Sequence, residues 1–77
     1  MPHPNYPYAA RNRGETGTVI VSVLFDSKGK VSRVDIQQSG GPDLDFSTRS
    51  FILHHWRAPL LAGEIAIVPV VYALEPR

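Results

Sequence analysis

The chain has 77 residues, enough for one small domain, and a domain of this size buries only about 60% of the surface that its unfolded form exposes. Eight Lys and Arg residues against seven Asp and Glu give a net charge of +1, and the basic residues are scattered, which argues against a nucleic-acid groove. The absence of cysteine excludes disulfides and Cys-based zinc sites.

The N-terminal part of the sequence predicts an extended arm followed by a short helix. Residues 1–5 contain two prolines, which favour an extended backbone, and we interpret them as the end of a Pro-rich linker. Residues 6–77 would then form a single domain. Pro7 suits the first turn of a helix and Gly14 suits its left-handed end, so about two helical turns are expected between them.

The next segment predicts a β-hairpin. Hydrophobic residues alternate over residues 18–26, as in a half-buried strand, and the face that points inward consists of Val19, Val21, Val23 and Phe25. Residues 26–30 are typical of a hairpin loop in which Gly29 supplies a positive φ. A second strand is expected from Val31 to Gln38, and its inward residues would be Val34, Ile36 and Gln38.

A longer helix and a final strand follow. Asp43 or Asp45 is expected to cap the helix, which should stop near Arg57 because Pro59 disfavours helical backbone in the residue before it. The final strand is predicted over residues 64–74, where hydrophobic side chains occupy both faces. This stretch contains a proline and is far shorter than the roughly 20 residues of a membrane-spanning helix.

These elements predict an α+β fold. A right-handed crossover through the longer helix places the third strand beside the first and antiparallel to it, in the order 2-1-3. The expected architecture is therefore a three-stranded antiparallel sheet with one main helix packed on one face and a short N-terminal helix. The third strand would form an edge of this sheet.

The edge of the third strand is the predicted binding site. Pro69 has no N–H, so its empty position should point away from the neighbouring strand, and no Lys or Arg blocks the edge. An unprotected edge of this kind can hold an added peptide strand through main-chain hydrogen bonds. The alternative is that Pro69 only prevents aggregation at an ordinary edge. The predicted site residues on this strand are Ile65, Ile67, Val68, Pro69, Val71 and Ala73.

Other candidate residues are assigned structural roles. His54 and His55 are adjacent on the helix and point about 100° apart, so they cannot chelate one ion, and we expect one to face the core and the other to face solvent. Asp43 and Asp45 are interpreted as helix caps and not as paired catalytic carboxylates. Trp56 is expected in the core. No catalytic spacing, phosphate loop or zinc motif is present, so the sequence predicts no enzyme activity, cofactor or metal.

The sheet face opposite the main helix is expected to be apolar. Ile20 and Leu24 on the first strand would neighbour Ile67 and Val71 on the third. Large exposed apolar patches commonly mark interfaces. Two alternatives remain open for covering this face: a homodimer, with or without exchanged strands, and packing under the N-terminal helix and arm.

Several landmarks of the sequence follow one another in a fixed order. They are Tyr6-Pro7, Gly14-Glu15-Thr16-Gly17, Asp26-Ser27-Lys28-Gly29-Lys30, Ser39-Gly40-Gly41-Pro42, Leu44-Asp45, and Trp56-Arg57 before Pro59. In this order and at this spacing they resemble the C-terminal domain of TonB, the periplasmic energy transducer of Gram-negative bacteria, over residues 5–74. The sequence departs from the family at Ala58, where the family has a bulky aromatic residue, and in a helix that is one residue longer.

The resemblance implies a periplasmic, non-enzymatic module that binds the N-terminal TonB box of an outer-membrane TonB-dependent transporter by β-strand addition. It would couple the proton motive force to uptake through ExbB-like and ExbD-like inner-membrane proteins, with a membrane anchor preceding this chain in the full-length protein. The resemblance also implies transporter contacts by residues at the Tyr-Pro pair, namely His3, Asn5, Tyr6 and Pro7. Core packing for Tyr6 and helix initiation for Pro7 are the alternatives.

A second function remains open beside the transducer. A TonB-like or TolA-like domain could serve as a structural or assembly module of the cell envelope that has no role in energising transport. Nucleic acid is not expected as a partner in either case.

Overall fold

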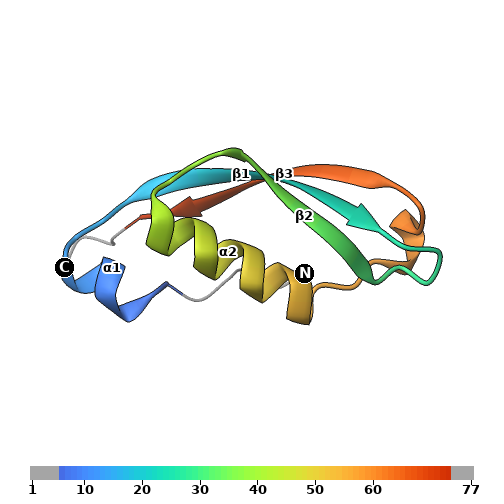
Figure 1. Cartoon of the computed structure of the whole chain (residues 1–77), viewed down its shortest axis with the longest axis horizontal. Coiled ribbons are helices and arrows are strands. Elements are labelled where there is room, and N and C mark those ends of the chain that lie inside the picture. The colour runs from blue at the N-terminus through green and yellow to red at the C-terminus, as the bar shows by residue number, and fades with distance from the viewer. Residues whose placement is uncertain (1–5, 74–77) are drawn as a thin grey trace.

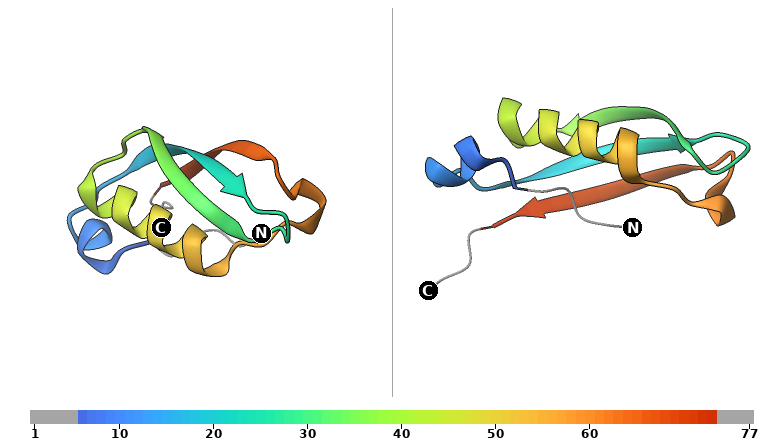
Figure 2. Two further views of the ribbon diagram at one scale, coloured as in Figure 1. Left: turned by 45° about the vertical axis from the view of Figure 1, so that its right-hand side comes forward. Right: turned by 90° about the horizontal axis from the view of Figure 1, so that it is seen from below.

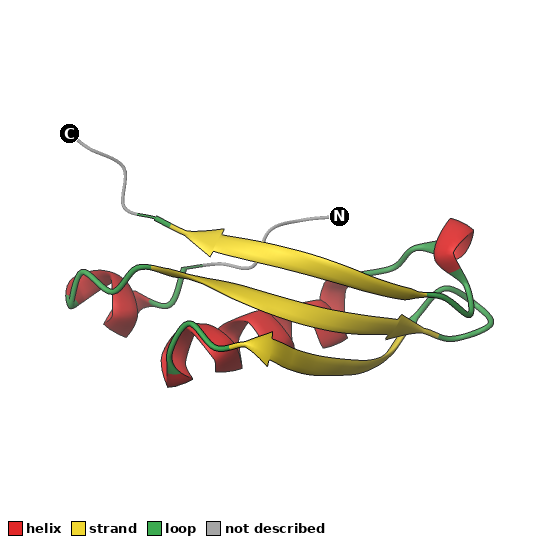
Figure 3. Ribbon diagram, turned by 90° about the horizontal axis from the view of Figure 1, so that it is seen from above, coloured by secondary structure: helices red, strands yellow, loops and turns green. Residues whose placement is uncertain are grey.

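The computed structural model describes residues 6–73. In chain order it contains α1 (Tyr8–Asn12), β1 (Gly17–Phe25), β2 (Val31–Gln38), α2 (Pro42–His55), the 3-10 helix η1 (Pro59–Leu61) and β3 (Ile65–Tyr72). The strands form one antiparallel sheet in the order β2-β1-β3, which confirms the predicted fold. In Figures 1 and 3, α1 and α2 lie on one side of the sheet, and the opposite face carries neither helix.

Some predictions fall outside the described part of the chain. The proposed linker at residues 1–5, with the candidate site residues His3 and Asn5, lies outside it. The end of the predicted last strand at Leu74 does so too. These remain predictions from the sequence.

The inner face of β1 forms the centre of the core. Its four inward residues are at most 1% exposed, and they are Val19, Val21, Val23 and Phe25. α2 and β3 complete the same cluster, chiefly through Leu44, Ile52, Val70 and Tyr72. Full burial of a side chain of this size stabilises the fold by about 1.5–3 kcal/mol. The alternation seen in the sequence of β1 is therefore the pattern that forms the core.

The end of β2 differs from the prediction. The pairing shifts between Ile20 and Val21, so that Ile20 lies opposite Gln38 while Val21 lies opposite Ile36. One extra residue in β2 therefore forms a bulge, which turns Gln38 to the outer face together with Ile20. Gln38 is exposed, and the prediction that it points inward is wrong.

The N-terminus of α2 also corrects a prediction. The residue at the N-cap is Gly41, and no side chain caps this end. Asp43 and Asp45 lie within the first turn instead, where the free N–H groups and the helix dipole favour negative charge. The Asp45 carboxylate accepts a hydrogen bond from Gly40 N–H at 2.8 Å, so it holds the chain that enters the helix.

α2 ends at His55, two residues before the predicted end near Arg57. Trp56 adopts an extended backbone with φ −82° and ψ 143°, and its side chain is buried in the core, as predicted. His54 and His55 are both exposed, so the prediction that one of them faces the core is wrong. The buried residues of α2 are Leu44, Thr48 and Ile52, and the next buried side chain along the chain is that of Trp56.

The hairpin loop at residues 26–30 packs tightly against η1. Gly29 has the predicted positive φ, +80°, and a Cβ at this position would lie 2.6 Å from Pro59 Cα. Ala58 N–H donates to Gly29 O at 2.8 Å, which holds the two segments together. This contact fixes the path of the chain into β3.

Substitution of Gly29 tests that contact. We expect Gly29→Ala to lower the free energy of unfolding by about 3 kcal/mol, since a methyl group would add a clash to the cost of a positive φ. Gly63→Ala is the matched control, because Gly63 has φ +76° but no atom within 4 Å of its added Cβ. The control should lose only about 1 kcal/mol in urea denaturation. Equal losses would show that the approach to Pro59 contributes nothing.

Acid titration tests the hydrogen bonds that the Asp26 carboxylate accepts within the same loop. The Asp26 carboxylate accepts N–H donors from Lys28 at 2.8 Å and Lys30 at 3.0 Å, and these bonds lower the pKa of Asp26. The contribution of Asp26 to stability is therefore full above its unfolded pKa of about 4 and is lost as the pH falls through the lower folded pKa. In urea denaturation between pH 2 and 5, Asp26→Asn should lose stability with falling pH less steeply than the wild type. Parallel curves would contradict this role.

Candidate functional site

The direction of the main-chain groups of β3 follows from its pairing with β1. Phe25 N–H donates to Glu64 O at 3.0 Å, and the register then runs without a shift to the pair Gly17 and Tyr72. Antiparallel pairs alternate between hydrogen-bonded and non-hydrogen-bonded, so the even-numbered residues of β3 bond β1. The odd-numbered residues direct their N–H and C=O groups away from β1. Pro69, opposite Ile20, belongs to this outward set, as predicted.

The side chains of the outward set share the open face of the sheet. Ile65 and Ile67 are each 62% exposed, Val71 is 57% exposed, and Pro69 is exposed as well. Ala73 lies just beyond β3 and is exposed. The structure thus brings the odd-numbered predicted site residues onto one face and one edge.

Val68 belongs to the inward set. Its main chain lies opposite Val21 in the ladder with β1, and its half-buried side chain packs against the core. A partner added at the outer edge would meet neither its N–H nor its side chain. Val68 is therefore not part of the outer edge of β3.

The two outer edges of the sheet have different chemistry. On β2, Val34 O accepts a hydrogen bond from Arg49 Nε of α2 at 3.3 Å, and Arg33 forms an ion pair with Asp35 at 2.8 Å. Charged side chains of this kind protect an edge strand. β3 carries no charged residue from Ile65 to Tyr72. In Figure 2, α2 runs beneath β2 and β1, and β3 lies to the side of it.

A buried hydrogen bond ties β3 to α2. The Thr48 hydroxyl lies 2.8 Å from the Tyr72 hydroxyl and donates to Leu44 O at 2.7 Å. Both side chains are at most 2% exposed. Alternation places Tyr72 inward, but no sequence signal predicts its partner, because the two residues are 24 positions apart. The contact holds the C-terminal end of β3 against the helix.

The Tyr6-Pro7 pair lies close to this end of β3. The Tyr6 ring meets the Tyr72 ring edge-on, with centroids 5.2 Å apart, and its hydroxyl donates to Glu15 O. Pro7 O accepts Arg11 N–H at 2.9 Å, which begins the first turn of α1. These contacts are the packing and helix-starting roles that the sequence offered as alternatives. They place Tyr6 beside the strand that forms the candidate edge.

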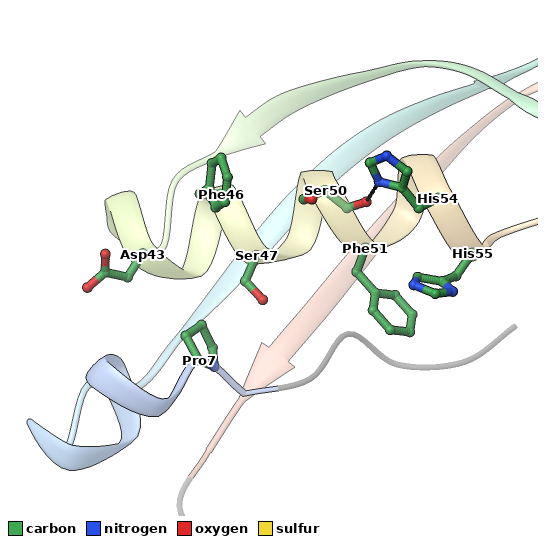
Figure 4. Close-up of a pocket in the computed structure, with 8 residues that line it drawn as sticks. All are labelled: Pro7, Asp43, Phe46, Ser47, Ser50, Phe51, His54 and His55. Carbon is green, nitrogen blue, oxygen red and sulfur yellow. Dashed lines mark hydrogen bonds between the residues drawn. The ribbon is translucent and has the colours of Figure 1, made fainter.

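A hollow of about 490 Å³ lies along the exposed side of α2. Figure 4 shows Phe51 and His55 pointing to one side of the helix and Ser50 and His54 to the other. His54 Nδ1 lies 2.7 Å from the main-chain oxygen of Ser50. The His55 ring packs against the Phe51 ring, with the ring centroids 4.4 Å apart. The two imidazoles thus have separate partners and do not converge on one point.

Residues 6–73 contain neither a metal-binding group nor a membrane-spanning helix. No group of three His, Asp or Glu side chains in this range could hold a metal ion. No helix in the same range is long and apolar enough to cross a membrane.

Residues 2–74 match the model of one protein family, described as Gram-negative bacterial TonB protein C-terminal. The match covers nearly the whole chain, from the first prolines to the end of the predicted last strand. No curated protein matches the sequence.

The Thr48 and Tyr72 hydroxyls give a stability prediction. In a double-mutant cycle with Thr48→Val and Tyr72→Phe, we expect each single change to destabilise the domain and the two changes to be coupled by about 1 kcal/mol. The free energies of unfolding of all four proteins in urea would measure this coupling. Additive losses would mean that the two hydroxyls do not interact.

Proposed function

Because the chain belongs to the family of Gram-negative bacterial TonB protein C-terminal domains, we propose that it binds a TonB box peptide of an outer-membrane TonB-dependent transporter by strand addition to β3. Domains of this family are transport-associated and non-catalytic. The bound peptide would extend the sheet to four strands, in the order β2-β1-β3-peptide. The outer edge that would receive the peptide comprises Ile65, Ile67, Pro69, Val71 and Ala73.

The contrast between the two sheet edges carries this proposal. An added strand needs unblocked main-chain groups and no charge that it must desolvate. β2 fails this test because Arg49 already bonds Val34 O and because Arg33 and Asp35 line the strand. β3 meets it at Ile65 and Ile67, which direct their polar main-chain groups outward from an uncharged strand.

The same geometry suits transmission of force. A pull along the added strand loads several parallel hydrogen bonds together, whereas each bond alone contributes only about 1 kcal/mol. We propose that the domain acts in the periplasm and that the full-length protein is anchored in the inner membrane. There it would receive energy from ExbB-like and ExbD-like proteins. The residues upstream of α1, including His3 and Asn5, would add contacts to the transporter.

A second candidate function rests on the open face of the sheet. On this face Ile65 lies opposite Leu24, Ile67 opposite Ser22 and Pro69 opposite Ile20. Neither helix covers this face (Figure 3). Exposed apolar patches mark interfaces, so this face would serve a structural or assembly module of the cell envelope, in the manner of TolA, or a homodimer. In that function the β3 edge would bind no transporter peptide.

Opposite-edge lysine variants separate the two functions. A synthetic box peptide is titrated into the labelled domain, and the affinity is measured from amide chemical shifts. Ile67→Lys places a charge on the proposed edge and should weaken binding about tenfold, since a buried apolar contact is lost and an ammonium group is desolvated. Gln37→Lys adds the same charge to β2, at an exposed position, and should leave the affinity unchanged.

The outcomes point to different functions. Weaker binding by Ile67→Lys alone supports strand addition to β3. Equal affinities for both variants and the wild type would show that the peptide binds elsewhere than at β3. If the wild-type domain does not bind the peptide at all, the assembly function is favoured and the transducer function is contradicted.

A further inference from the structure

A proline in the middle of the β3 edge suggests how the edge selects its ligand, and this inference rests on the proposed strand addition. We propose that Pro69 divides the edge, so that a bound peptide pairs with residues 65–68 and leaves the sheet at the proline. The ligand is then a short extended segment with uncharged, apolar side chains on the open face.

The outward main-chain groups define the ladder. Ile65 and Ile67 each offer one N–H and one C=O, and Pro69 offers only a C=O. An added strand can therefore form two hydrogen bonds at each isoleucine, whether it runs parallel or antiparallel, whereas Pro69 has no N–H to give it. A ladder of this length engages about five peptide residues.

The proline ring also blocks the close approach of a strand. A ladder bond places the peptide oxygen about 2.9 Å from the nitrogen, but Cδ replaces the hydrogen and a carbon needs about 3.3 Å to an oxygen. Because Cδ lies about 1.5 Å beyond the nitrogen, the peptide carbonyl is pushed outward by about 2 Å. A strand that pairs with Ile67 must therefore separate from β3 at Pro69.

The N-terminal half of the edge offers the longer ladder, because two outward residues of β3, Ile65 and Ile67, precede Pro69 and only Val71 follows it before the strand ends at Tyr72. The entry into β3 is fixed by Gly63 N–H, which donates to Phe25 O and Asp26 O at 3.1 Å each, and by Glu64 O, which accepts Phe25 N–H at 3.0 Å. A strand held in place before binding loses less entropy when a partner is added.

The neighbours of Ile65 and Ile67 define the side chains that the ligand needs. On the open face, Leu24 lies opposite Ile65, Ser22 opposite Ile67 and Ile20 opposite Pro69. Peptide side chains on this face would lie along Ile65 and Ile67, each 62% exposed before binding. A charged side chain here would lose water without meeting an opposite charge on β3. The edge thus favours apolar residues at alternate positions of the segment.

Replacement of the proline tests the division. The labelled wild-type domain and Pro69→Ala are titrated with a synthetic box peptide, and amide hydrogen exchange is followed along β3. In the wild type, we expect the peptide to slow exchange at Ile65 and Ile67 but not at Val71. In Pro69→Ala, the slowed exchange should extend through residue 69 to Val71, and binding should tighten about tenfold as the ladder lengthens. Pro42→Ala is the control, because Pro42 is exposed at the start of α2, away from this edge.

Each outcome is decisive. Peptide-induced protection on both sides of Pro69 in the wild type would overturn the division while leaving strand addition intact. Unchanged affinity and unchanged protection in Pro69→Ala would do the same. Absence of peptide binding to β3 in both proteins would contradict strand addition and, with it, this inference. A gain in affinity by Pro42→Ala equal to that of Pro69→Ala would attribute the effect to general chain flexibility.

Discussion

The buried inner face of β1 is the constraint on which the rest of the structure depends. Four alternate residues of this strand must face α2 to make a core in so short a chain, and β2 and β3 pair with both of its sides. The outer edges of the sheet then belong to β2 and β3. Burial in one strand thus sets where the candidate site lies, although that strand takes no part in the site itself.

The outer edges of β2 and β3 carry different side chains and contacts. The crossover through α2 brings Arg49 to Val34 O and leaves β3 beside the helix layer and not above it. One edge is covered and charged, and the other presents Ile65 and Ile67. This asymmetry directs an added strand to one side of the molecule. It also explains how a sheet with two edges avoids pairing on both.

Local signals in the sequence predicted the strands and the positive φ of Gly29, because alternation and turn chemistry act within a few residues, and the right-handed crossover rule predicted the sheet order. They failed where a distant contact decides. The bulge that turns Gln38 outward depends on the register with β1, and the hydrogen bond from Arg49 to Val34 O joins residues 15 positions apart. The helix end at His55 reflects the packing of Trp56. For the candidate site, the outward direction of Pro69 followed from the missing N–H, whereas no sequence signal showed that Arg49 bonds the edge of β2.

Intermolecular NOEs between an unlabelled box peptide and the isotope-labelled domain would test strand addition most directly. Pairing at the β3 edge predicts cross-strand contacts from peptide backbone protons to the amides of Ile65 and Ile67, with none to β2. A peptide that shows its NOEs only to the side chains of α2 or of the open sheet face would contradict strand addition and place the interaction elsewhere.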